Sequence, residues 1–154
     1  MMPPARNRFD WHKLAEENTV PVFLIRHGQT SWNKERRFLG RTDIPLDDEG
    51  KIQAYQVALS LHNTPIAGLY SSPLSRARET AEAISARCNQ PIHEITALTE
   101  LDQGEIEGQY GDVLLDRYAD FFQEWKDNPA HARVPGGETL TECQERASLA
   151  VHQI

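Results

Sequence analysis

The chain has 154 residues, which is enough for one domain with a single hydrophobic core. Hydrophobic residues make up 39% and charged residues 25%, and these proportions indicate neither a disordered chain nor a membrane protein. The formal net charge of −7 disfavours nucleic acid as a partner, because a phosphate backbone needs a basic face. A small anionic substrate stays compatible with this charge, since a local arginine cluster can override the global sign.

The two cysteines and the N-terminal residues bear on the compartment. Cys88 and Cys143 lie far apart and outside any metal-binding spacing, which predicts reduced thiols in a cytoplasmic protein. No apolar run approaches the length of a transmembrane helix, so we expect no membrane partner. Residues 1–19 lack the apolar stretch of a secretory signal. We expect them to form a polar extension with a short helix around 11–17, followed by one domain over 20–154.

The domain alternates short apolar runs with longer segments that repeat apolar residues at helical spacing. The expected strands are 21–25, 65–72 and 91–95. The expected helices are 46–63, 72–88, 114–128 and 134–154, the last opening with a turn. Residues 96–111 are glycine-rich and acidic, which predicts a loop. Alternating strands and helices predict an α/β fold around a mostly parallel sheet.

Local signals predict how two helices begin and how one packs. Asp47 or Asp48 is placed to cap the helix over 46–63. Pro73 suits the first turn of the next helix, and Ser72 before it suits the cap. The aromatic residues of segment 114–128 are expected to pack in the core rather than to form a ligand cage; they are Phe121, Phe122 and Trp125.

Arg26, His27 and Gly28 directly follow the expected strand over 21–25. Sites of parallel α/β sheets form beyond the carboxyl ends of the strands. A neutral imidazole can act as a nucleophile, and an arginine fork matches phosphate or carboxylate oxygens. A glycine lets a tetrahedral group approach the backbone closely. The tripeptide therefore suits an anion whose central atom is attacked by imidazole, although such a tripeptide alone also arises by chance.

Four segments extend this pattern in order along the chain. They are 24–50, 71–80, 100–108 and 135–140, the last followed by Arg146. These segments resemble the histidine phosphatase superfamily, in the branch that holds cofactor-dependent phosphoglycerate mutases and their phosphatase relatives. Because the four matches occur in order and are spread over nearly all of residues 20–150, chance is not a serious alternative explanation of the resemblance.

The resemblance implies that His27 attacks phosphorus and forms a phosphohistidine. Glu100 would protonate the leaving oxygen and later help to activate water. Arg26 and Arg76 would hold the phosphoryl oxygens, with Asn33 assisting. Phosphoryl transfer needs mainly positioning and charge neutralisation, which two arginines supply, so we expect no metal and no other cofactor. Taken singly, Arg76 also fits a surface salt bridge and Glu100 an ordinary loop acid.

Further residues of the first segment belong to the expected site or its rim. Thr30 and Gly40 match the family pattern and are expected at the substrate phosphate. Arg36, Arg37 and Arg41 form a basic rim in an acidic chain. They belong either to a solvated loop or to a surface that steers or holds the remote part of the substrate.

Mutases and phosphatases of this family share the phosphohistidine and differ in the group that accepts the phosphoryl. The short segment between Arg76 and Glu100, and the lack of a basic, asparagine-containing run after Glu100, favour a phosphatase over a mutase. Segments 43–54, 100–108 and 135–140 look more like the phosphatase group, which includes alpha-ribazole phosphatase-like enzymes. Leu39 stands where mutases usually have a small polar residue. We therefore expect a phosphomonoester hydrolase for a small phosphorylated metabolite, with a mutase and a non-catalytic phosphate-binding module as alternatives.

Family members also carry a second histidine, in a His-Gly pair that ends a strand. The resemblance places this pair just beyond Ile154. His152 lies inside a helical pattern and lacks a following glycine, so we expect a helix-face histidine there. The expected architecture is a three-layer α/β/α domain with a mostly parallel, phosphoglycerate mutase-like sheet whose C-terminal part is missing. A fragment, a truncated product and a chain completed by a second chain, including a homo-oligomer, all stay open.

Overall fold

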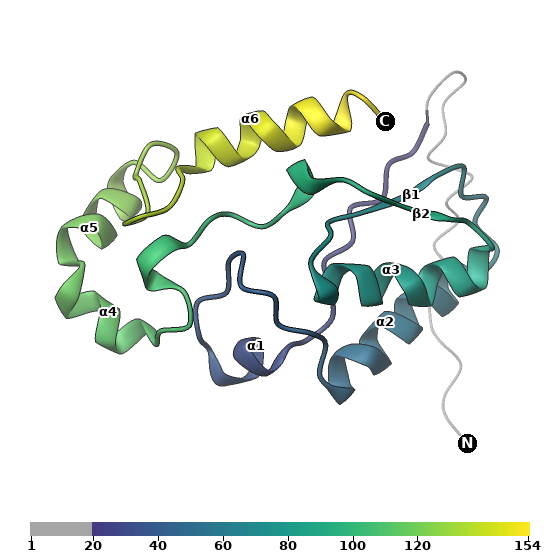
Figure 1. Ribbon diagram of the computed structural model, residues 1–154, viewed down its shortest axis with the longest axis horizontal. Coiled ribbons are helices and arrows are strands. Elements are labelled where there is room, and N and C mark those ends of the chain that lie inside the picture. The colour runs from purple at the N-terminus through teal and green to yellow at the C-terminus, as the bar shows by residue number, and fades with distance from the viewer. Residues whose placement is uncertain (1–19) are drawn as a thin grey trace.

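The computed structural model describes residues 20–154, and the short helix expected around 11–17 lies outside them. The described chain forms six helices, a two-stranded sheet and two 3₁₀ turns (Figure 1). In chain order these are α1 (Ser31–Glu35), α2 (Asp48–Ser60), β1 (Leu69–Ser71), α3 (Ser75–Cys88), β2 (Ile92–Glu94), the turns Thr96–Leu98 and Gly104–Ile106, α4 (Gly111–Arg117), α5 (Ala119–Asp127) and α6 (Leu140–Val151). None of these helices is long and apolar enough to cross a membrane.

β1 and β2 pair in parallel, with Leu69 opposite Ile92 and Ser71 opposite Glu94. α3 connects the two strands, as a parallel pair requires a crossover. In the view of Figure 1, α2 and α3 lie to one side of the strands and α6 lies to the other. The α/β class predicted from the alternating pattern is therefore confirmed, with a small parallel sheet.

The strand expected over 21–25 is not formed. These residues run without secondary structure, and Val22 and Leu24 expose 70% and 89% of their surface. A strand requires a neighbouring segment that exchanges backbone hydrogen bonds with it. No segment of residues 20–154 forms such a ladder with 21–25, so the apolar run alone does not make a strand here.

Acidic side chains mark where α2 and α3 begin, a neighbouring residue for α2 and a residue distant in sequence for α3. Asp47 caps α2, because its carboxylate accepts a hydrogen bond from the Gly50 amide at 2.8 Å. α3 begins only at Ser75, whose amide and hydroxyl donate to the two carboxylate oxygens of Asp43 at 2.7 and 2.8 Å. The prediction that Ser72 caps this helix is therefore wrong, because a loop acid distant in sequence supplies the acceptor.

The helix expected over 114–128 is two helices. The chain breaks at Tyr118, whose backbone angles of −124° and 39° leave the helical region. The Tyr118 hydroxyl donates to Glu105 at 2.8 Å, so the residue at the break also contacts the loop before α4. The aromatic rings of α5 pack on the buried residues around Leu114, as the sequence predicts.

Two apolar clusters hold the described chain together. Ala58, Leu61 and Ile84 pack α2 against α3 beneath β1. The second cluster joins α4, α5 and the loop before them, and its buried members are Leu101, Ile106, Leu114 and Val134. The segment from residue 26 to 46 runs between these two regions in Figure 1. This segment carries most of the residues that the sequence assigns to a site.

Candidate active site

His27 is half-buried, and its ring has a defined hydrogen bond. Nδ1 lies 2.7 Å from the carbonyl oxygen of Gly28. Because a carbonyl only accepts, Nδ1 carries the proton and donates it. In the neutral ring, Nε2 is then the unprotonated nitrogen and holds the lone pair that a nucleophile needs.

Four neighbours act on the pKa of His27, which lies below its ordinary value of 6.5. Burial is the largest cause, and the hydrogen bond to Gly28 opposes it. The positive charges of Arg76 and Arg26 lower this pKa further, whereas the carboxylate of Glu100 raises it. The structure thus brings the predicted nucleophile, both predicted arginines and the predicted acid within electrostatic reach of one another.

We expect a proton-NMR titration of the His27 ring to give a midpoint below 6.5, the ordinary value. A lowered pKa keeps the imidazole neutral to more acidic pH. We therefore expect the acid limb of the kcat/KM profile to extend below the pH range in which an ordinary histidine titrates. Arg26→Gln removes one of the positive charges and should move the midpoint upward. A midpoint at or above 6.5 in the unaltered chain would contradict this electrostatic assignment.

Close backbone packing fixes the position of the residue after His27. A Cβ atom on Gly28 would lie 2.8 Å from the carbonyl carbon of Gly50 and overlap its oxygen, at the first turn of α2. The Gly28 amide donates to the Thr80 hydroxyl at 3.2 Å, and that hydroxyl donates to the Arg76 carbonyl at 2.8 Å. α2 and α3 therefore both hold the backbone at Gly28, directly after His27.

Gly28→Ala is expected to lower kcat/KM by about 10- to 100-fold and the free energy of unfolding by about 1–3 kcal/mol, because backbone atoms must shift. Gly111→Ala is the matched control, since a Cβ there would meet only Phe38 at an ordinary 3.9 Å. The free energy of unfolding of the control should lie within about 1 kcal/mol of that of the unaltered chain. Equal activity and equal melting of the two variants would contradict the packing assignment.

Arg76 is a buried cation that is only 1% exposed. Its Nη1 donates to the Thr42 carbonyl at 3.0 Å and its Nη2 to the Gly40 carbonyl at 2.6 Å. Within residues 20–154 no carboxylate lies at ion-pair distance from it, and burial lowers its pKa against the opposing charge of Glu100. A buried guanidinium without an ion-pair partner favours the approach of an anion.

Two cavities meet at His27. The larger has a volume of about 610 Å³ and the smaller about 210 Å³, and Arg26, Gly28 and Gln53 line both of them together with His27. Arg26 is exposed, and within residues 20–154 it makes no ion pair. Gln53 was not predicted as a site residue; its Oε1 accepts from the Gln29 amide at 2.9 Å. In the sequence it looks like any polar residue of an amphipathic helix.

Asn33 lines the larger cavity, and Thr30 lies behind it. The Thr30 side chain is fully buried and forms the capping box of α1. Its hydroxyl donates to Asn33 Oδ1 at 3.0 Å and accepts from the Asn33 amide at 3.2 Å. Asn33 Oδ1 is thereby occupied, which leaves its Nδ2 donor for a ligand. Thr30 supports Asn33 rather than facing the cavity, and Gly40 likewise acts through its carbonyl on Arg76.

Glu100 is exposed and lies in the loop after β2. Its Oε1 accepts a hydrogen bond from the Leu101 amide at 2.9 Å. Glu100 is not among the residues that line the two cavities, although its charge acts on His27 and Arg76. Its backbone carbonyl accepts a hydrogen bond from Arg146 of α6 at 2.9 Å.

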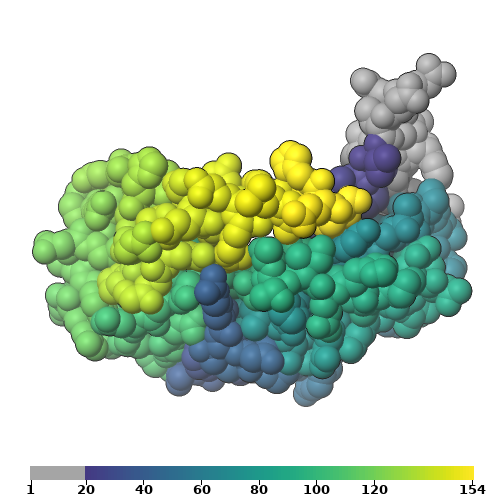
Figure 2. Space-filling model, turned by 45° about the horizontal axis from the view of Figure 1, so that its top comes forward, coloured from purple at the N-terminus to yellow at the C-terminus, as the bar shows by residue number. Residues whose placement is uncertain are grey.

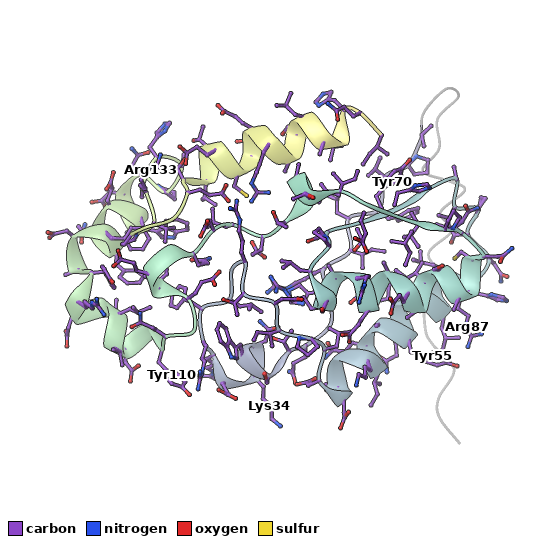
Figure 3. The ribbon with its side chains drawn as sticks, in the orientation of Figure 1. Lys34, Tyr55, Tyr70, Arg87, Tyr110 and Arg133 are labelled. Atoms are coloured by element: carbon purple, nitrogen blue, oxygen red, sulfur yellow. The ribbon has the colours of Figure 1, made fainter. Side chains whose placement is uncertain are left out.

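The basic rim divides into two parts. Arg36 and Arg37 line the larger cavity together with Leu39. The Arg37 guanidinium lies 5.0 Å from the centre of the Tyr110 ring, and Figure 3 shows Tyr110 between α1 and α4. Arg41 lines neither cavity and instead pairs with acids near α6. Only the first part can contact the remote portion of a ligand.

His152 does not belong to the site. It follows α6, is exposed, and its Nδ1 donates to the Ser148 carbonyl at 2.7 Å. This placement agrees with the prediction of a histidine on the helix rather than in the pocket.

Comparisons with known proteins agree on one family. A model of the histidine phosphatase superfamily (branch 1) matches residues 22–154. The chain is 36% identical over 132 residues to probable phosphoglycerate mutase GpmB of Citrobacter koseri, which covers 86% of this chain and 61% of that protein. GpmB of Escherichia coli K12 shows the same identity and coverage. The chain thus spans 61% of the length of these curated relatives.

Solved structures give the same result. YhfR of Bacillus stearothermophilus is 33% identical with a TM-score of 0.77, over 83% of this chain and 63% of that one. The alpha-ribazole phosphatase of Shigella flexneri is 26% identical with a TM-score of 0.76, over 84% and 64%. A mycobacterial glucosyl-3-phosphoglycerate phosphatase, solved as a complex with VO3, is 27% identical with a TM-score of 0.76, over 82% and 63%.

Proposed function

The chain belongs to the histidine phosphatase superfamily, and from this premise we propose that it hydrolyses phosphomonoesters of small metabolites through a phosphohistidine at His27. One observation carries the proposal. His27, whose Nε2 is unprotonated, lines both cavities, and the charge of the buried Arg76 acts on its ring, although Arg76 lines neither cavity and lacks a carboxylate partner within residues 20–154. A nucleophile beside an unneutralised cation suits a tetrahedral dianion.

The first step is transfer of the phosphoryl group to the enzyme. Nε2 of His27 forms a bond to phosphorus while the ester P–O bond breaks, and Glu100 gives a proton to the leaving oxygen. Arg76 and Arg26 neutralise the charge on the phosphoryl oxygens, and Asn33 offers its Nδ2 as a further donor. The loop carbonyls that bind Arg76 prevent its fork from rotating away.

The second step returns the enzyme to its resting state. Water attacks phosphorus, Glu100 accepts a proton from it, and the N–P bond breaks to release inorganic phosphate. The hydrogen bond from Nδ1 to Gly28 keeps the same nitrogen available for the next cycle. No metal enters these steps, because the two arginines and the asparagine supply the positive charge and the donors.

Phosphoglycerate mutase chemistry is the second candidate, and the 36% identity to the proteins named probable phosphoglycerate mutase favours it. The two candidates differ in whether water or a bound intermediate accepts the phosphoryl group. Incubation with 3-phosphoglycerate, followed for free phosphate and for 2-phosphoglycerate, separates them. We expect free phosphate. Isomerisation without phosphate release would favour the mutase, and binding without either product would favour a non-catalytic phosphate-binding module.

Compartment and partners follow from the same proposal. We propose a cytoplasmic enzyme, where thiols such as the free Cys88 and Cys143 stay reduced. A small phosphorylated metabolite is the only ligand that the proposed chemistry requires, with nucleic acid disfavoured by the net charge of −7. A homo-oligomer stays an open alternative that sedimentation at low concentration would decide.

Glu100→Gln is expected to slow alkyl phosphates about 100-fold or more in kcat/KM, because an alkoxide leaves only with a proton. 4-Nitrophenyl phosphate needs no such help, so its kcat/KM should change by less than about 5-fold. The ratio of the two constants is the measurement. Equal slowing of both esters would remove Glu100 from the role of acid.

A further inference from the structure

A partly buried hydrogen-bond network lies between α6 and the loop that carries Glu100. Arg146, on α6, has a side chain that is 21% exposed. Its Nη1 donates to the Ala97 carbonyl at 2.8 Å and the Thr99 carbonyl at 2.7 Å, and its Nη2 donates to the Glu100 carbonyl at 2.9 Å. One guanidinium thus binds three carbonyls in the four residues that end at Glu100.

The other side of the same guanidinium binds Glu138. Arg146 Nε donates to Glu138 Oε1 at 3.0 Å and Nη2 to Oε2 at 2.7 Å, a bidentate pair. Glu138 also accepts from the Asp102 amide at 2.9 Å. Hydrogen bonding from Arg146 is the main reason that the pKa of Glu138 falls to about 2. The chain is therefore held at residues 97–100 by Arg146 and at residue 102 by Glu138.

Arg41 joins this network to the loop that holds Arg76. Arg41 Nη1 lies 3.0 Å from the Asp102 carboxylate, and Nη2 lies 3.1 Å from the Glu138 carboxylate. The flanking carbonyls of Gly40 and Thr42 are the ones that bind Arg76. Figure 2 shows the loop around residue 40 (blue) reaching up to α6 (yellow), between the region of α4 and α5 (green) and the region of α3 (teal).

We infer that Arg146 is a positioning residue, which places the Glu100 carboxyl relative to His27 and the phosphate held by Arg76. The inference rests on the proposed function of Glu100 as the acid. The side chain of Glu100 is exposed and binds only the adjacent Leu101 amide among the described residues, so its location follows from its backbone. A displacement of about 1 Å in a catalytic group costs about 100-fold in rate.

Arg146→Lys tests this inference because it keeps the positive charge and removes the fork. A lysine ammonium cannot reach three carbonyls and a carboxylate in the same geometry. We expect kcat/KM for ethyl phosphate to fall about 10- to 100-fold, and that for 4-nitrophenyl phosphate to fall less than about 3-fold. The loss should therefore be selective for the poor leaving group, as in Glu100→Gln.

Arg133→Lys is the matched control. Arg133 lies in the segment before α6, pairs with Glu142 on α6 and donates to the Gly137 carbonyl at 3.1 Å. Figure 3 shows Arg133 beside the start of α6. It binds none of residues 97–102, so the substitution changes an arginine–glutamate pair on the same helix without touching the acid loop. Its leaving-group ratio should equal that of the unaltered chain.

A purely structural role predicts a different result. A smaller fraction of folded molecules lowers kcat/KM for ethyl phosphate and for 4-nitrophenyl phosphate by the same factor. An unchanged ratio of these two constants in Arg146→Lys would therefore overturn the inference and leave the proposed function intact. If thermal melting shows that Arg146→Lys does not fold, Glu138→Gln weakens the same network and is expected to show the same selective loss; an unchanged ratio there would also overturn it. Failure of the unaltered chain to hydrolyse either ester would overturn the proposed function, and this inference with it.

Discussion

His27→Ala is expected to abolish phosphomonoester hydrolysis, with a loss of about 10⁶-fold in kcat that brings it to the limit of detection. The imidazole nitrogen forms the bond to phosphorus in the covalent intermediate, and no other residue that lines the two cavities offers an unprotonated nitrogen with a free lone pair. Since the ring is half-buried and, among the described residues, hydrogen-bonds only to the Gly28 carbonyl, its removal should change the melting temperature by no more than a few degrees.

His152→Ala is the control for this loss. The ring of His152 is exposed after α6 and binds only the Ser148 carbonyl among the described residues. We expect unchanged kcat and kcat/KM with 4-nitrophenyl phosphate. Loss of turnover in His152→Ala, or full turnover in His27→Ala, would contradict the assignment of the nucleophile.

Arg76→Gln is expected to lower kcat/KM by about 100- to 1000-fold, because the transition state loses the positive charge of the buried cation that acts on His27. The same change should weaken competitive inhibition by vanadate by a comparable factor, since that oxyanion occupies the position of the transferring group. Circular dichroism and thermal melting report whether the loop carbonyls of Gly40 and Thr42 tolerate the loss of their donor.

Arg78→Gln controls for charge on the same helix. Arg78 lies two residues further along α3, has a side chain that is 48% exposed, and pairs with Glu82 at 3.6 Å. An exposed ion pair of this kind contributes little to stability. We expect wild-type kcat/KM and vanadate inhibition. Equal losses in Arg76→Gln and Arg78→Gln would show that net charge rather than the buried fork binds the anion.

Local patterns predicted the elements whose formation depends on neighbours in sequence. α2 and α3 follow from helical spacing, and β1 and β2 are apolar runs between turn residues. The strand expected over 21–25 failed because pairing with another segment is not a property of the run itself. The break at Tyr118 was not predicted either, since the apolar spacing continues through it and the contact of Tyr118 with Glu105 appears only in the folded chain.

The same distinction applies to the site. The electrostatic proximity of His27, Arg26 and Arg76 was predictable because a motif names them. Thr30 carries the same kind of signal, yet its hydroxyl is consumed in the cap of α1, and only the folded chain shows this. Gln53 carried no signal in the sequence at all, because its place on the pocket wall follows from how α2 packs on the Gln29 backbone.

Covalent capture of phosphorus by His27 is tested most directly by rapid-quench labelling with a radioactive phosphomonoester. We expect a burst of protein-bound label that is stable to base, lost in acid, and recovered on the peptide that contains His27. His27→Ala should show no burst under the same conditions. Steady release of free phosphate without any bound label, or label recovered on a different residue, would contradict a phosphohistidine at this position.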